Sequence, residues 1–368
     1  MTSENLNSNA KNNKYLIYMA LTVILSVFSA LSGDLLVSII VAAVGGGFFA
    51  SVCLDKLKGW RVGVMAILPP VLAFAFTQSP ENTMLSLGFL PVGVVTLYCM
   101  KKGFTRSQLI VRGVASLALF YGAFFSLCIY RLFGSLSIET AEKFIRLNID
   151  VILFYMNEAK EIYTERGIDK EIIEKLFSKE VLDELVTALR VSWLGYGLAL
   201  FGVASFSASA IAKFTLSEKD KKAFFDRVGK WRFVLSKIGA CVFIIAYFAS
   251  SLYSGEKEGL YLPFALNAIC LSMMPGVLYM GVRRIFDVIH PTKKTTTLIF
   301  IIVAATVMGK FAMLFFMILG IYSSLIYKEK PEIEKNEKKF KTFFRKRGKI
   351  IRKTGNLYKK LVEIYKQL

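Results

Sequence analysis

The sequence predicts an all-α fold, a polytopic transmembrane helical bundle of about eight to ten membrane segments with an extramembrane two-helix insert. Hydrophobic residues make up 55% of the 368 positions, which is more than soluble domains contain. They are gathered in blocks that reach or approach the roughly 20 residues needed to cross a bilayer. The longer blocks are Tyr15–Ser32, Leu35–Leu54, Val111–Tyr130, Val191–Ala212, Phe233–Tyr253, Leu260–Val282 and Thr295–Tyr327, and two shorter blocks with prolines are Val62–Phe76 and Met84–Met100.

These blocks and the polar segments between them divide the chain into five parts. We expect a polar N-terminal tail, two membrane halves separated by a charged helical insert, and a basic C-terminal tail. Tyr15–Ser32 is interpreted as a retained first span, because no small-residue cleavage site precedes Gly33. The predicted boundaries are 1–14, 15–134, 135–190, 191–327 and 328–368.

The charge distribution predicts how the chain is oriented. The formal net charge is +20, yet residues 135–190 carry 8 Lys and Arg against 12 Asp and Glu. Residues 328–368 carry 15 Lys and Arg against 5 Asp and Glu, and loops rich and poor in basic residues alternate along the chain. Because basic loops stay in the cytoplasm, we expect a cell-membrane protein with both termini cytoplasmic and the insert outside.

Two segments are interpreted from their helical pattern. In the insert, apolar residues at helical spacing predict two amphipathic helices, with a break at Gly167 and an N-cap at Asp169. They would form an external cap, or alternatively lie as solvated helices on the membrane surface. The last block contains Gly309-Lys310 near its middle, which predicts a hairpin of two short helices, the alternative being one tilted span.

Small residues at four-residue spacing mark a close-packing face on the second block. Ala42, Gly46 and Ala50 lie on this face, and Gly47 extends it. Small residues at this spacing let helix backbones approach closely in membranes. The pattern fits internal packing, and it also fits a docking surface for a membrane partner.

A proline and an asparagine mark a candidate ligand site in "LNAICLSMMPGVLYMGVRRIFD". Pro275-Gly276 predicts a kink or break near mid-membrane, since proline removes a helix hydrogen bond. Asn267 lies two turns earlier, and a polar side chain in a span should face protein or a cavity. Broken helices beside polar residues build transporter sites, so Asn267, Pro275 and Gly276 are candidate ligand-binding residues. The alternative is a packing kink with a hydrogen-bonded asparagine.

Enzyme chemistry is not expected from the motifs. His290 is the single histidine, and it has no metal-ligand spacing around it. No P-loop and no G-x-S-x-G motif are present, so we expect no catalytic residue, no metal and no cofactor. The basic tail, with apolar residues interleaved, predicts contact with anionic lipid. A solubilising tail is an alternative, and nucleic acid is less favoured.

The stretch "LPFALNAICLSMMPGVLYMGVRRIFD", together with the order of hairpins and insert, resembles the YybS-like family of bacterial multi-pass membrane proteins with a domain of unknown function. The resemblance covers roughly residues 15–327. It implies a distant relation to the substrate-binding subunits of energy-coupling-factor transporters, which bind a small ligand and dock on a membrane partner powered by separate ATPases. The basic tail and the insert depart from such minimal subunits.

Two functions follow as hypotheses. The first is a non-catalytic transporter-like subunit that binds a small ligand and docks on a membrane partner. The second is a membrane scaffold or regulatory protein whose basic tail engages anionic lipid or a cytoplasmic partner.

Overall fold

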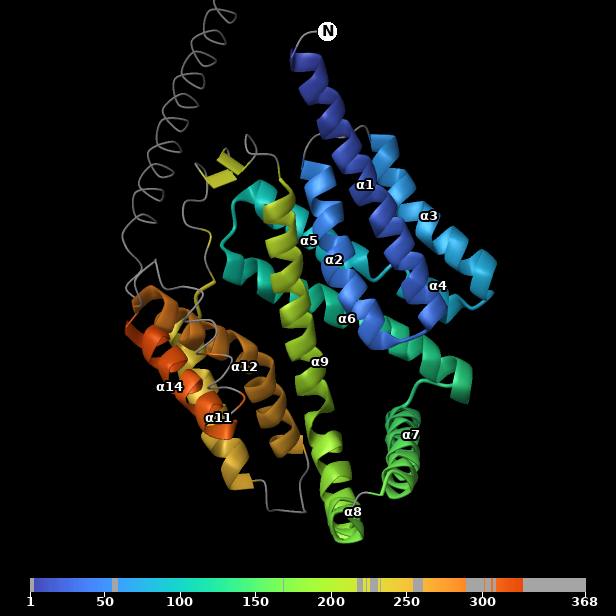
Figure 1. Ribbon diagram of the computed structural model, residues 1–368, viewed down its shortest axis with the longest axis vertical. Coiled ribbons are helices and arrows are strands. Elements are labelled where there is room, and N and C mark those ends of the chain that lie inside the picture. Colours follow the sequence, from blue (N-terminus) through green and yellow to red (C-terminus); the bar gives the residue numbers. More distant parts are fainter. Residues whose placement is uncertain are drawn as a thin grey trace, which may run out of the picture. The chain divides into compact units, whose positions relative to one another are not determined.

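The computed structural model of the chain is built from α-helices (Figure 1). It describes residues 3–54, 59–167, 169–216, 221–222, 224–225, 231, 233–253, 261–288, 301, 306 and 309–326. The helices are α1 (Ser3–Ser32), α2 (Leu35–Leu54), α3 (Gly59–Thr77), α4 (Pro80–Leu85), α5 (Phe89–Lys102), α6 (Arg106–Phe133), α7 (Ile138–Glu165), α8 (Lys170–Leu176), α9 (Lys179–Thr215), α11 (Lys237–Tyr253), α12 (Tyr261–Val288) and α14 (Lys310–Ile326).

The helices confirm the predicted multi-pass membrane bundle. Within the described residues, six apolar segments are long enough to cross a membrane, and three shorter apolar helices accompany them. Large apolar side chains also lie exposed on the outer faces, among them Ile67, Phe76, Leu119 and Leu252. Exposed apolar surface on this scale is typical of contact with lipid rather than water.

The centre of the bundle is formed by α2 and α9. Helix α2 packs against α1, α5 and α9, and α9 in turn packs against α6 and α12. Figure 1 shows α9 lying between the helices that precede it and those that follow it. Ala42, Ala204 and Ala208 are buried in this contact together with Tyr121 and Phe201. Small side chains let the backbones approach, and aromatic rings fill the remaining space.

The C-terminal helices pack through a pair of glycines. A Cβ added to Gly281 of α12 would overlap the carbonyl oxygen of Phe316, and one added to Gly320 of α14 would overlap the carbonyl oxygen of Val277. Each helix therefore presents a glycine to the backbone of the other. This is the close approach that small residues permit in membranes.

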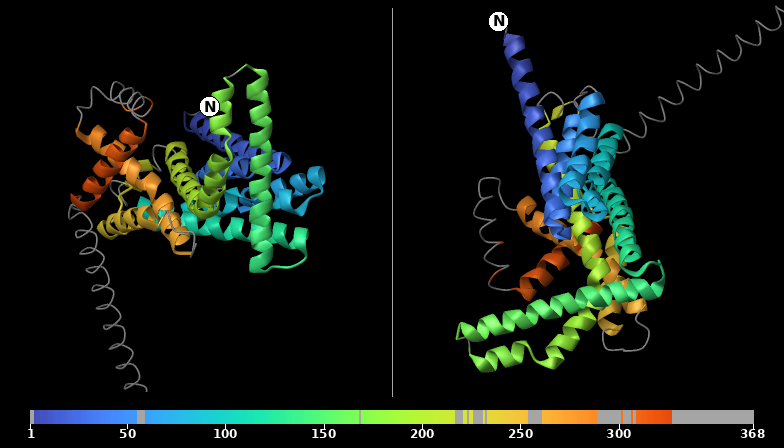
Figure 2. Two further views of the ribbon diagram at one scale, coloured as in Figure 1. Left: turned by 90° about the horizontal axis from the view of Figure 1, so that it is seen from below. Right: turned by 90° about the vertical axis from the view of Figure 1, so that its right-hand side faces the viewer.

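The insert has the predicted break and N-cap, but its second helix differs from the prediction. Gly167 has a φ of +74°, and the Asp169 side chain accepts a hydrogen bond from the Glu171 amide as the N-cap of α8. The second predicted helix is split, however, because α8 ends at Leu176 and Ser178 caps a new helix, α9. Helix α9 then continues without interruption into the next span. Figure 2 shows α7 running crosswise to α1.

Two further predictions concern segments of which the structure describes only a part. Gly309 has a φ of +45° and α14 begins at Lys310, so the break predicted in the last block is confirmed at this point. Most of the first arm of the predicted hairpin lies outside the described residues, as does the basic tail 328–368. Helix α1 begins at Ser3, so its backbone extends through residues 3–14, which were predicted as a polar tail.

Candidate functional site

Arg106 lies in the first turn of α6 and is held against α9. Its Nε donates to Ser209 Oγ at 3.0 Å, and its Nη2 donates to the Phe206 carbonyl oxygen at 3.2 Å. Its guanidinium carbon lies 3.7 Å from the ring centroid of Phe206 and 5.7 Å from that of Trp231. Stacking on aromatic faces and two directed hydrogen bonds fix a guanidinium in position. Arg106 therefore presents its charge from a defined place.

Arg283 lies on the last turns of α12, near the same place. Its Nη1 donates to the Phe233 carbonyl oxygen at 3.4 Å, and its Nε lies 3.6 Å from Asp287 Oδ2. The Arg283 side chain is 14% exposed, whereas that of Asp287 is 49% exposed. Because the carboxylate faces water, it neutralises the arginine only weakly.

Arg106, Lys213 and Arg283 together form what we call the cationic cluster. Within the described residues they are linked through aromatic residues rather than directly. Arg106 stacks on Phe206 and Arg283 donates to the Phe233 carbonyl oxygen, and the rings of Phe206 and Phe233 both lie against Tyr279.

Trp231, near Arg106, packs on Phe224, which packs on Phe225. Lys213 Nζ, at the end of α9, lies 4.9 Å from the ring centroid of Phe225. Among the contacts of these three cations in the described residues, Asp287 is the single carboxylate. In the part of the chain that the structure describes, three cations and one carboxylate therefore make up the cluster.

Aromatic rings and one serine make a frame around the cluster. The Tyr279 ring lies 4.9 Å from that of Phe206 and 5.8 Å from that of Phe233, between centroids. Ser107 Oγ donates to the Val234 carbonyl oxygen at 2.7 Å and accepts from the Val234 amide at 3.0 Å. The Trp231 indole donates to the Phe104 carbonyl oxygen at 3.1 Å. Residues next to α11 are thereby attached to the start of α6, so the frame is fixed.

Helix dipoles act differently on the three cations. Lys213 and Arg283 lie near the C-terminal ends of α9 and α12, where the dipole favours positive charge. Arg106 lies at the N-terminal end of α6, where the dipole opposes it. The N-terminus of α6 is closed by a capping box, in which Thr105 Oγ1 accepts from the Gln108 amide and Gln108 Oε1 accepts from the Thr105 amide. The three basic side chains therefore suit contact with anionic groups through their own charge.

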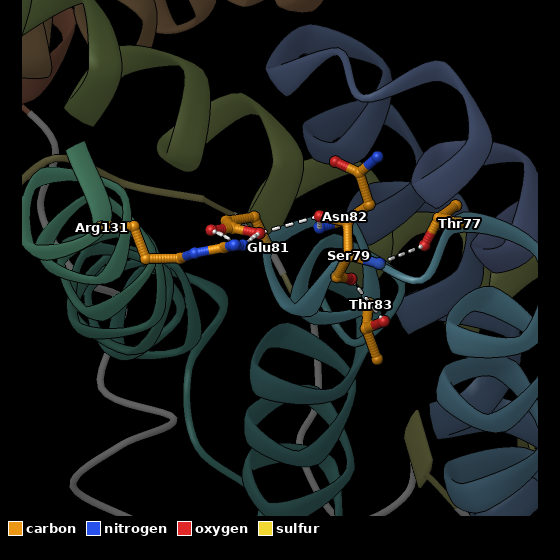
Figure 3. A network of polar contacts seen from close by, with 6 residues as sticks. All are labelled: Thr77, Ser79, Glu81, Asn82, Thr83 and Arg131. Carbon is orange, nitrogen blue, oxygen red and sulfur yellow. Dashed lines mark hydrogen bonds and ion pairs between the residues drawn. The ribbon is translucent and has the colours of Figure 1, made fainter.

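A different polar network lies near the other end of α6. Arg131, on its last turn, makes an ion pair with Glu81 of α4 (Figure 3). Glu81 also accepts from Ser79 Oγ at 2.8 Å, and Thr83 Oγ1 donates to the Ser79 carbonyl oxygen at 2.7 Å. Here each charge has an opposite partner. The network joins α4 to α6 and leaves no excess charge.

The residues predicted to bind a ligand do not lie at a broken helix. A kink or a break was predicted at Pro275, and the break is not found, because helix α12 is continuous across this residue. Pro275, Gly276 and Asn267 are half-buried. A Cβ added to Gly276 would lie 2.9 Å from the Phe233 ring, and one added to Gly195 of α9 would lie 3.0 Å from the Asn267 carbonyl oxygen. The proline is accommodated within a packed helix, which neighbouring helices permit in membranes.

The predicted docking face is occupied by the chain itself. Ala42, Gly46, Gly47 and Ala50 are all buried. A Cβ added to Gly46 would meet Val92 and Gly93 of α5, and one added to Gly47 would meet Ile211 and the Ala208 carbonyl oxygen of α9. Of the two alternatives given for this face, the structure therefore favours internal packing, since α5 and α9 cover these residues.

The cationic cluster was not predicted from the sequence. Arg106, Lys213 and Arg283 are far apart in the chain and were interpreted only as basic residues at the cytoplasmic ends of spans. One signal was present, because each lies at the boundary between an apolar block and a basic loop. That signal gives the side of the membrane but not which helix ends meet.

No comparison with known proteins assigns the chain to a family. No family model, curated protein or solved structure matches it. Within the described residues, no group of three or more His, Cys, Asp or Glu side chains is placed to hold a metal ion. The resemblance to the YybS-like family therefore stays a prediction, and function is argued from the cluster alone.

Proposed function

We propose that this chain is a non-catalytic membrane scaffold or regulatory protein whose basic side engages anionic lipid. The observation that carries the proposal is the cationic cluster, in which Ser209 and Phe206 hold Arg106 against α9 and the Phe233 carbonyl oxygen holds Arg283. The basic loops predict this side as cytoplasmic. The cytoplasmic leaflet presents anionic headgroups, which attract basic segments at about 1 kcal/mol per Lys or Arg.

The proposal extends the prediction made for the basic tail. Residues 328–368 carry 15 Lys and Arg, and they lie outside the described residues. The cluster supplies a second basic element, whose position is fixed by hydrogen bonds and ring contacts rather than by charge alone. A protein with both elements would associate with anionic lipid at its cytoplasmic side.

The transporter-like subunit stays a prediction with less support. Its ligand site was argued from a break at Pro275, yet α12 is continuous there. Its docking face was argued from Gly46 and Gly47, which are buried against α5 and α9. Neither feature now favours that function over the scaffold.

The proposal is tested by measuring which lipids the protein retains. The full chain and a chain lacking residues 328–368 are purified from the same defined mixture of phosphatidylglycerol and phosphatidylcholine, and retained lipid is quantified by mass spectrometry. We expect enrichment of the anionic lipid with both chains, and more with the full chain. Retention of both lipids in the ratio supplied, with both chains, would contradict the proposal.

A further inference from the structure

We infer that one face of α7 binds the lipid surface of the membrane, with its apolar side chains in the headgroup layer on the side where α6 ends. This face carries Val151, Tyr155 and Ile162, which we call the α7 row, and these residues are 46%, 63% and 46% exposed. The inference goes beyond the proposed function, because that function concerns the other end of α6, where Arg106 lies.

The α7 row shares its side of the helix with Phe144. Val151, Tyr155 and Ile162 follow Phe144 by 7, 11 and 18 residues, which are close to whole numbers of helical turns. A helix in a membrane interface has an apolar side toward the lipid and a polar side toward water. The opposite side of α7 is polar and exposed, with Glu139, Arg146, Asp150 and Asn157.

The contact of Phe144 shows which way the α7 row faces. Its ring centroid lies 6.0 Å from that of Phe125, and Phe125 belongs to α6, one of the apolar segments long enough to cross a membrane. The side of α7 that carries the row is therefore turned toward the spans. Figure 2 shows α7 crosswise to α1, another such segment, so α7 lies along the membrane surface.

The α7 row lies beyond the part of the helix that packs on the bundle. Helix α7 has 28 residues, a length of about 42 Å, and its buried residues Thr140 and Ile149 lie in its first half. Exposed apolar residues also stand at the end of α6 and in the turn before α7, among them Leu132 and Leu136. The lipid-facing surface of the span therefore extends along the chain to α7. Tyr155 suits this position, because tyrosine is enriched at headgroup level.

Charge decides the depth of the row and the kind of lipid. Glu158 is exposed and lies beside the row, and a carboxylate is costly in the acyl core, so the row reaches the headgroup layer. Residues 135–190 carry 8 Lys and Arg against 12 Asp and Glu, a net charge of −4. Anionic headgroups would repel such a segment, so the inferred partner is a zwitterionic lipid surface.

The test identifies what lies against each side of α7. A photoreactive amino acid that carries a diazirine replaces Tyr155 in one full-length chain and Asn157 in another. Asn157 is the matched control, because it is exposed on the polar side of the same helix. Both chains are placed in nanodiscs of phosphatidylcholine and irradiated, and mass spectrometry identifies the adducts.

We expect at least about fivefold more lipid adduct from position 155 than from position 157, since only the first faces the membrane. Three other results would overturn the inference. A crosslinked dimer from position 155 would make a second copy of the chain the partner. A crosslink to another segment of the same chain would make α7 a cap over the bundle. Equally little lipid adduct from both positions would make α7 a solvated helix.

Two double variants, each made in the chain labelled at position 155, test the role of the row itself. Val151→Asn with Ile162→Asn should lower the lipid adduct about threefold or more, because two apolar side chains leave the lipid. Asp150→Asn with Thr164→Asn, on the polar side, should stay within about twofold. Equal losses in the two variants would overturn the role of the row.

The lipid composition separates this inference from the proposed function. Replacing phosphatidylcholine by phosphatidylglycerol should leave the adduct from position 155 unchanged or lower it. A rise of more than about twofold would overturn the zwitterionic partner. The enrichment of anionic lipid that tests the proposed function is measured on chains with an unchanged α7, so either result can fail without the other.

Discussion

Helix α6 carries an arginine at each end, and the two are placed in opposite electrostatic settings. Arg131 on the last turn pairs with the carboxylate of Glu81 and lies where the helix dipole favours a cation. Arg106 on the first turn contacts Ser209, Phe206 and Trp231 instead, and lies where the dipole opposes a cation. One end is an ion pair, and at the other end the arginine is held by neutral groups alone among its contacts in the described residues.

The difference teaches how to separate structural from functional charge in a membrane bundle. Both arginines are hydrogen-bonded, so hydrogen bonding does not distinguish them, and Arg131 is the more exposed of the two. The chemistry of the neighbours does distinguish them, because Arg131 pairs with a carboxylate whereas Arg106 contacts a hydroxyl, a carbonyl and aromatic rings. The predictions below test that distinction, beginning with the change that should have the largest effect.

The largest effect is expected from separating α6 from α9. Gly113 of α6 faces Ser205 of α9, and a Cβ there would overlap the Ser205 side chain. Gly113→Leu should lower stability by about 2–3 kcal/mol through overpacking and should also weaken phosphatidylglycerol binding, because Arg106 is held by Ser209 and Phe206 of α9. Thermal unfolding in detergent measures the first and native mass spectrometry the second.

The matched control lies on the same helix. A Cβ added to Gly122 meets nothing within 4 Å in the described structure. Gly122→Leu should change stability by no more than about 0.5 kcal/mol. If the two variants unfold at the same temperature, the packing described for α6 and α9 is wrong.

A smaller effect on stability is expected from breaking the ion pair. Arg131→Gln leaves Glu81, which is 17% exposed, without its cation. The melting temperature should fall, by less than half the fall seen for Gly113→Leu, and the difference from the unchanged protein should shrink at high salt because salt screens the pair. Arg106→Gln should change the melting temperature less when no anionic lipid is present, since it also removes a cation that the dipole of α6 opposes. The reverse order of the two variants would mean that Arg106 is the structural residue.

The smallest effect is expected from removing the carboxylate near Arg283. Asp287 lies 3.6 Å from Arg283 and is about half exposed. Asp287→Asn should strengthen phosphatidylglycerol binding about twofold, the change that an exposed ion pair of about 0.5 kcal/mol allows. Titration by native mass spectrometry measures this, and weaker binding would show that Asp287 supports lipid binding rather than opposing it.

Local patterns predicted local structure well in this chain. The apolar blocks predicted the membrane helices, Gly167 predicted a break, and Asp169 predicted an N-cap. Gly309 predicted the break that precedes α14. These features depend on neighbouring residues along the chain. Pro275 is an exception, because a proline predicts a kink or a break, yet α12 is continuous there. Packing on adjacent helices accommodates the proline.

The candidate site was not predictable, because it depends on which helices pack together. Arg106 contacts α9 only because α6 packs on that helix, and Arg283 belongs to a helix, α12, that packs on α9 as well. The Gly46 and Gly47 pattern left two interpretations open for a related reason. Small residues permit close approach to any helix, so the pattern cannot say whether the neighbour is a partner or the chain itself.

The most direct test of the account compares the two ends of α6 with one substitution each. Arg106→Gln and Arg131→Gln remove the same charge from the same helix, and native mass spectrometry with phosphatidylglycerol measures binding to each. The account predicts about a fivefold to tenfold loss for Arg106→Gln and binding within about twofold of the unchanged protein for Arg131→Gln. Equal binding by the two variants, or a larger loss for Arg131→Gln, would contradict it.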